Sequence, residues 1–177
     1  AGYAVMLWDF DGHAANPAPL DRAAGLQRNV DTALAALLEQ PEVDAARLAI
    51  VGHSMGSGVA MTAGIAAPER YAAVVAISPT AAEVSADAPR NLLLQAGSWE
   101  GRFVANAESL LAAAGGPNAD LAGGRARQLT VIPNVEHMSI LFSPASHRAT
   151  LDWLNDTFGL TTVMPYTDRR ILWYLLH

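Results

Sequence analysis

The sequence has 177 residues, and 51% of them are hydrophobic, which suits one globular domain with a sizeable core and excludes a disordered chain. The formal net charge of −6 gives no electrostatic reason to expect a nucleic-acid partner. The chain contains no cysteine, which excludes disulfides and thiolate chemistry and leaves the redox compartment open.

Strand-like apolar runs alternate with helix-like segments along most of the chain. We expect strands at 2–10, 47–51, 71–78, 91–96 and 127–133, and helices at 22–40 (with Asp21 as its N-cap), 57–67, 101–114 and 146–158. Such alternation is typical of a doubly wound α/β fold, with a mostly parallel sheet of about five strands and helices on both faces. We assign residues 1–160 to this core and residues 161–177 to a C-terminal tail.

The sequence Gly52-His53-Ser54-Met55-Gly56 stands between the second predicted strand and the helix that follows it. A Gly-x-Ser-x-Gly pattern in this context predicts a nucleophile elbow, in which strained backbone angles expose the serine Oγ above the sheet. We expect close packing to leave no room for side chains at Gly52 and Gly56. The backbone N–H of Met55, at the helix start, would face a developing oxyanion. The alternative is a Gly-rich turn with an incidental serine.

The motif resembles the elbow of the α/β-hydrolase fold, especially of its esterases, lipases and dienelactone-hydrolase-like members. The resemblance covers most of residues 3–159. It implies that the acid and then the histidine follow the nucleophile along the chain. His137, just past the last predicted strand, is where the family places its base, whereas His13 and His53 precede Ser54. We interpret His53, where relatives often carry histidine, as packing support.

The orienting acid has three candidates. Glu100 lies three residues beyond Gly97, at the end of a predicted strand, where similar hydrolases carry their acid, although aspartate is commoner there. Glutamate suits the role, which is to hold the imidazole tautomer and stabilise the imidazolium. Glu83 and Asp87 follow the preceding strand, to which some relatives move the acid. We therefore assign Glu100 and keep the other two as rivals.

Asp9, Asp11 and His13 together suggest a metal site by residue type alone. Relatives, however, commonly carry Asp-x-x-Gly-His in the loop after this strand, where it is structural. The resemblance therefore implies no metal site, and acyl transfer by a serine needs no cofactor.

The resemblance implies a serine hydrolase that cleaves a small-molecule carboxylic ester through an acyl-enzyme. Only about a dozen residues separate the third and fourth predicted strands, which leaves no room for a cap and favours small or accessible esters. The alternative function is a non-catalytic or poorly active hydrolase-like domain that serves as an interaction or membrane-associated module. A fluorophosphonate probe that reacts with Ser54 would distinguish the two.

The tail places a basic pair before an aromatic, leucine-rich run at 167–177. Such a run suits the start of an interfacial or membrane segment, and equally a helix packed on the domain's own surface. The first interpretation predicts membrane contact through the tail, and the sequence leaves the localisation open between cytoplasmic and membrane-associated.

The run at 4–10, with the loop, helix and elbow strand after it, resembles the family's fourth strand rather than its first. The resemblance thus implies that earlier strands lie upstream of Ala1, together with the loop that supplies a second oxyanion donor. Loss of one such donor typically costs about 10²–10³ in kcat. We expect a first strand that has shifted or swapped, weak activity, and a homodimer formed through an open sheet edge.

Overall fold

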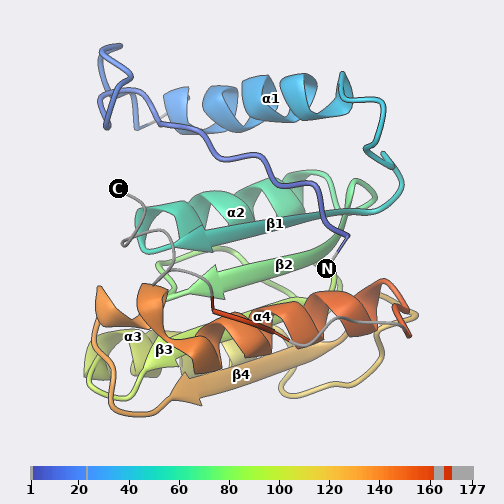
Figure 1. Ribbon diagram of the computed structural model, residues 1–177. Coiled ribbons are helices and arrows are strands. Elements are labelled where there is room, and N and C mark those ends of the chain that lie inside the picture. The colour runs from blue at the N-terminus through green and yellow to red at the C-terminus, as the bar shows by residue number, and fades with distance from the viewer. Residues whose placement is uncertain (1, 23, 162–165, 169–177) are drawn as a thin grey trace.

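The computed structural model describes residues 2–22, 24–161 and 166–168. Within them lies one parallel four-stranded sheet in the order β1-β2-β3-β4, so neighbours in the sheet are also neighbours along the chain (Figure 1). β3 and β4 pair along their whole length, from Leu92 opposite Arg127 to Gly97 opposite Ile132. The strands are β1 (Leu48–His53), β2 (Tyr71–Ile77), β3 (Leu92–Gly97) and β4 (Arg127–Ile132).

The helices are α1 (Gly25–Leu38), α2 (Met55–Ala66), α3 (Gly101–Ala113) and α4 (Pro144–Thr157), with a short 3₁₀ helix, η1 (Ser139–Phe142). The helix expected at 22–40 begins later, because Ala24 occupies its N-cap position. The Asp21 carboxylate still accepts a hydrogen bond from the Ala24 N–H, at 3.2 Å. The prediction of Asp21 as the N-cap residue was therefore wrong by three positions, although this side chain does contact the start of the helix.

Helices cover both faces of the sheet, because successive residues of β2 belong alternately to two different hydrophobic clusters. Val74 and Ala76 belong to a core shared with α1, α2 and α3, whereas Ala73, Val75 and Ile77 pack on the face that α4 covers. All but Ile77 are fully buried. A strand apolar at every position is what a parallel sheet covered on both faces requires. The doubly wound α/β class is therefore confirmed.

The segment 2–10 is not a strand, so the described sheet has four strands where we expected about five. Val5 and Leu7 are 75% and 86% exposed. Residues 2–8 form no backbone–backbone hydrogen bond with any described residue. A β-prone sequence becomes a strand only when it pairs with a neighbouring strand, and this segment pairs with none of the described strands. The expectation of a buried first strand was wrong for that reason.

A half-open cavity of about 620 Å³ lies between the 2–8 segment, α1 and β1. Figure 1 shows the segment running between α1 and β1. Among the described residues, β1 pairs only with β2, so its other edge is open. The predicted homodimer requires such an open edge, at which a second chain could pair. The homodimer itself stays a prediction.

No helix in the described part of the chain is both long and apolar enough to cross a membrane. Most of the tail at 167–177, with its predicted membrane contact, lies outside the described residues.

Candidate active site

Ser54 forms the whole turn between β1, which ends at His53, and α2, which begins at Met55. Its backbone angles of φ 53° and ψ −119° lie in a sparsely populated region, at a cost of about 1–3 kcal/mol. A Cβ at Gly52 would overlap the carbonyl of Gly56, so no side chain fits there. At Gly56 itself a Cβ would meet nothing within 4 Å, so the expected lack of room was wrong for that glycine. The close contact in this turn is therefore between Gly52 and the backbone of Gly56.

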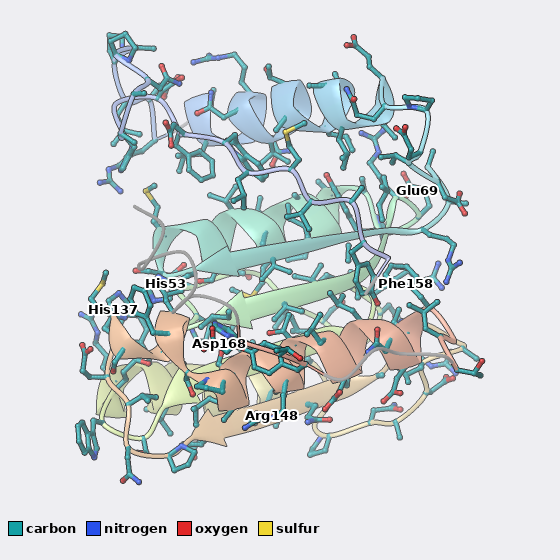
Figure 2. All side chains as sticks on the ribbon, viewed as in Figure 1. His53, Glu69, His137, Arg148, Phe158 and Asp168 are labelled. Carbon is teal, nitrogen blue, oxygen red and sulfur yellow. The ribbon has the colours of Figure 1, made fainter. Side chains whose placement is uncertain are left out.

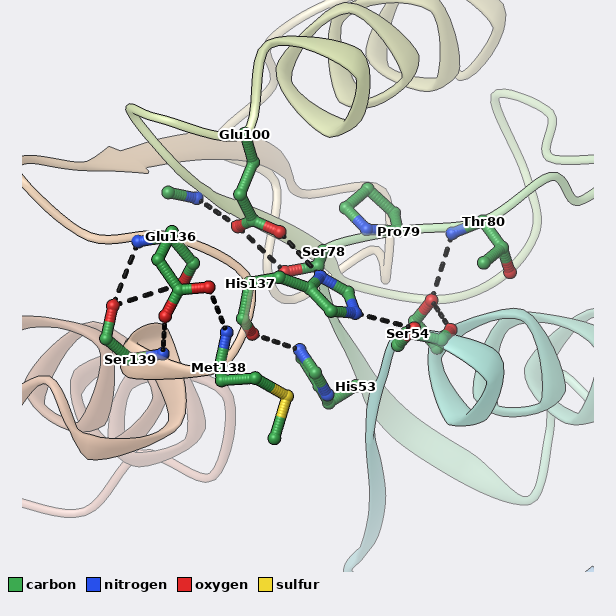
Figure 3. Close-up of polar contacts among 12 residues, drawn as sticks. His53, Ser54, Ser78, Pro79, Thr80, Glu100, Glu136, His137, Met138 and Ser139 are labelled. Atoms are coloured by element: carbon green, nitrogen blue, oxygen red, sulfur yellow. Dashed lines mark hydrogen bonds and ion pairs between the residues drawn. The ribbon is translucent and has the colours of Figure 1, made fainter.

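Ser54, His137 and Glu100 lie in one hydrogen-bonded row at the carboxyl ends of the strands (Figure 3). The Ser54 hydroxyl lies 3.0 Å from Nε2 of His137, and Nδ1 of His137 lies 2.7 Å from Oε1 of Glu100. Figure 2 shows His53 and His137 at this end of the sheet, with Glu69 and Phe158 at the opposite end. The row has the geometry that lets a histidine take a proton from a serine.

Glu100 is held by two further hydrogen bonds besides the one to His137. Its Oε2 accepts from the Gly97 N–H at 2.7 Å and from the Ser78 hydroxyl at 2.9 Å. The Glu100 side chain is only 3% exposed, and these three donors satisfy its carboxylate despite the burial. Sequence reasoning missed Ser78. The one sequence feature that could have indicated this role is that Ser78 carries a hydroxyl at the carboxyl end of β2, the strand that pairs with β3.

The rival acids lie elsewhere. Glu83 and Asp87 are exposed on the connection between β2 and β3, and neither forms a hydrogen bond or ion pair with His137. Of the three candidates, the structure brings only Glu100 to the histidine.

Comparison with known proteins identifies the family to which the chain belongs. The model of a protein family described as serine aminopeptidase, S33, matches residues 1–147. The chain belongs to this α/β-hydrolase family. Family membership gives the coarse class of the protein, a hydrolase. A comparison with curated proteins gave no significant match.

Three solved structures share the α/β-hydrolase fold of this chain. A predicted CIB-like hydrolase from Thermoplasma acidophilum is 20% identical with a TM-score of 0.62, over 84% of this chain and 70% of that one. A thermostable esterase is 19% identical with a TM-score of 0.57, over 81% and 38%. An S-formylglutathione hydrolase from Agrobacterium tumefaciens is 20% identical with a TM-score of 0.51, over 72% and 56%. The chain thus spans from 38% to 70% of their lengths.

His53 of this α/β-hydrolase contacts the backbone of His137. Its Nε2–H donates to the His137 carbonyl oxygen at 2.9 Å, and the two rings lie 4.6 Å apart. Burial, followed by the nearby His137, holds the pKa of His53 below its ordinary value. The neutral imidazole therefore anchors the loop that carries His137.

Glu136 stabilises the same loop through hydrogen bonds to the backbone that follows His137. Its carboxylate accepts from the backbone N–H groups of Met138, at 3.0 Å, and Ser139, at 2.7 Å (Figure 3). These two hydrogen bonds are the main reason that the pKa of Glu136 is lowered. The Phe103 ring of α3 stacks on His137 at 4.7 Å and 12°. Sequence gave no signal for Phe103, because only the packing of α3 brings it to the histidine.

The acidic loop near the N-terminus forms a network of its own. Asp11 accepts from the side chains of Asn29, at 3.0 Å, and Arg28, at 3.0 Å, and these bonds lower the pKa of Asp11. Asp9 accepts from a backbone N–H instead, and His13 lies against the Asp11 carbonyl oxygen. Across residues 2–22, 24–161 and 166–168, no three His, Asp or Glu side chains are grouped to hold a metal ion.

A second cavity, of about 530 Å³, opens beside Ser54. Its lining includes Met55, which as the first residue of α2 has a backbone N–H without an intrahelical acceptor. A carbonyl carbon in contact with the Ser54 Oγ would therefore place its oxygen near this N–H and the α2 N-terminus, which favour developing negative charge. The cavity offers space for the remainder of such a substrate.

Proposed function

We propose that this chain carries the active site of a serine hydrolase that cleaves carboxylic esters through an acyl-enzyme. The observation that carries the proposal is the row of Ser54, His137 and Glu100, with hydrogen-bond distances of 3.0 and 2.7 Å, at a strained strand-to-helix turn. Strain at a turn that exposes a hydroxyl is characteristic of a functional position rather than of a structural serine.

In the first half-reaction the Ser54 Oγ attacks the ester carbonyl carbon while its proton passes to Nε2 of His137. The carbonyl oxygen becomes an oxyanion near the Met55 N–H. The carbon–oxygen bond to the alcohol then breaks, and the alcohol leaves with the proton from Nε2. Glu100 accepts from Nδ1–H throughout, which keeps the reactive tautomer and stabilises the imidazolium.

In the second half-reaction water attacks the acyl carbon and gives one proton to His137. The bond from the acyl carbon to Ser54 breaks, the serine recovers its proton, and a carboxylic acid is released. One ester and one water thus give one acid and one alcohol, with no cofactor. Thioesters and amides follow the same steps. The short connection between β2 and β3 leaves no room for a cap over the site, which favours small or accessible esters over a substrate enclosed by a lid.

The test is Ser54→Ala with p-nitrophenyl butyrate as substrate and a fluorophosphonate probe as label. We expect hydrolysis to fall to background and labelling to disappear, because loss of the nucleophile lowers kcat by about 10⁶. The control is Ser109→Ala, which removes an exposed serine from α3 and leaves both readouts unchanged. Hydrolysis within a few-fold of the parent in Ser54→Ala, or no labelling of the parent, would refute the serine mechanism. The second result would favour the non-catalytic interaction domain.

A further inference from the structure

The cavity beside Ser54 carries two guanidinium groups and no carboxylate among its lining side chains. Arg22, just before α1, and Arg102, in the first turn of α3, both line it. Neither arginine forms an ion pair with a residue in the described part of the chain. Two acidic residues of the α1 region make other contacts, since Asp31 accepts from Gln27 and Asp21 accepts from a backbone N–H. The side chains that line this cavity thus carry two positive charges and no negative charge, in a chain of net charge −6.

Each guanidinium contacts a residue beside the reacting atoms. Nη1 of Arg22 lies 3.8 Å from the Sδ of Met55, whose N–H faces the expected oxyanion. The Arg102 guanidinium lies over the Phe103 ring, 5.0 Å from its centroid, and this ring stacks on His137. These contacts hold the positive charges near Ser54, and within residues 2–22, 24–161 and 166–168 no hydrogen bond occupies the remaining N–H donors of either arginine.

We propose that this cavity binds an anionic group of the substrate, a carboxylate or similar oxyanion, through Arg22 and Arg102. Guanidinium groups suit this task because their planar, permanently charged forks bind carboxylates bidentately. The two arginines are then specificity-determining residues that select esters carrying a negative charge away from the bond that is cleaved. The proposal rests on the proposed ester hydrolysis and adds a substrate class to it.

The experiment compares anionic and neutral esters of matched size. p-Nitrophenyl hydrogen adipate against p-nitrophenyl hexanoate places the charge on the acyl part, and 4-acetoxybenzoate against 4-acetoxybenzamide places it on the alcohol part. The measured quantity is the ratio of kcat/KM for the anionic member to that for the neutral member. Intrinsic reactivities cancel when this ratio is compared between variants.

We expect Arg22→Gln and Arg102→Gln each to lower the ratio about 5- to 20-fold for at least one pair, because each removes a charge-assisted hydrogen bond. Arg102→Lys should recover part of the loss. About 0.5 M NaCl should lower the ratio of the parent towards that of the variants, since the arginines are exposed and their field is screened. The salt readout requires no variant, so it is independent of any folding defect.

Arg70→Gln is the matched control. This exposed arginine precedes β2, beside Glu69, at the end of the sheet opposite His137 (Figure 2). We expect it to leave the ratio of both pairs unchanged. Equal ratios in the parent, Arg22→Gln and Arg102→Gln, with no effect of salt, would overturn the proposal while hydrolysis of the neutral esters stands.

Calorimetric titration with hexanoate and hexanamide, which are matched in size and differ in charge, separates this proposal from ester hydrolysis itself. We expect the parent to bind the hexanoate anion at least about fivefold more tightly than neutral hexanamide, and Arg102→Gln to lose that difference. If the chain hydrolyses none of the four esters, the proposed function fails, and the titration still decides whether the cavity binds anions. Equal affinity for hexanoate and hexanamide would refute the anion site.

Discussion

Glu100→Gln tests the role of the acid with little change of shape. In the folded chain Oε2 of Glu100 accepts from both Gly97 N–H and the Ser78 hydroxyl, while Oε1 accepts from Nδ1 of His137. A glutamine has one acceptor oxygen. The glutamine oxygen must take the position of Oε2 to keep the hydrogen bonds from Gly97 and Ser78. The side-chain NH₂ group then takes the position of Oε1 and faces His137.

The consequence is the wrong tautomer of His137. An NH₂ facing Nδ1 requires Nδ1 to be an acceptor, so the ring proton moves to Nε2 and faces the Ser54 hydroxyl. Nε2 is then no longer free to take the serine proton. A carboxylate-to-amide change with this effect lowers kcat by about 10⁴, or about 5 kcal/mol of transition-state stabilisation. KM should change little, because Glu100 is buried behind His137 and away from the substrate.

The assay is steady-state hydrolysis of p-nitrophenyl butyrate, with thermal unfolding to show that the variant folds. Glu83→Gln and Asp87→Asn are the matched controls, because both carboxylates are exposed and neither contacts His137. We expect both controls to keep the parent kcat. A kcat for Glu100→Gln within tenfold of the parent would refute the assignment, and a large loss in either control would move the acid to the connection after β2.

Two further predictions concern the elbow and pH. Gly52→Ala should lower the free energy of unfolding by about 3 kcal/mol or more, because its Cβ overlaps the Gly56 carbonyl, whereas Gly56→Ala should change it by no more than about 1 kcal/mol. Equal thermal midpoints for these two variants would contradict the described geometry. Since the pKa of His53 is lower in the folded chain than its ordinary value of 6.5, the unfolded chain binds more protons as pH falls below about 6.5. The free energy of unfolding should therefore decrease as the pH falls from about 6.5 to the pKa of His53 in the folded chain, and it should decrease less in His53→Gln. Denaturant titrations at pH 7 and pH 5 measure this decrease. An equal decrease in the parent and in His53→Gln would refute the prediction.

Much of the fold was predictable because it depends on short stretches of chain. The strand, Gly-x-Ser-x-Gly and helix sequence specifies the turn at Ser54 through local backbone sterics, and β1 to β4 follow apolar runs that suit a covered parallel sheet. The segment 2–10 had the same apolar character and was predicted wrongly. A strand also requires a partner, and no property of residues 2–10 reveals whether a neighbour will pair with them.

The sequence by itself determined the α/β class, the elbow at Ser54, and the positions of His137 and Glu100 just after predicted strands, because parallel strands bring their carboxyl ends to one edge of the sheet. The catalytic roles of these residues stay predictions. Tertiary structure alone decided which acid reaches His137, which side chains support Glu100 and His137, and where the charges of Arg22 and Arg102 gather. Ser54 and His137 are 83 positions apart and Ser78 and Glu100 are 22 apart. Contacts over such separations depend on how helices pack on the sheet, and no local pattern encodes that.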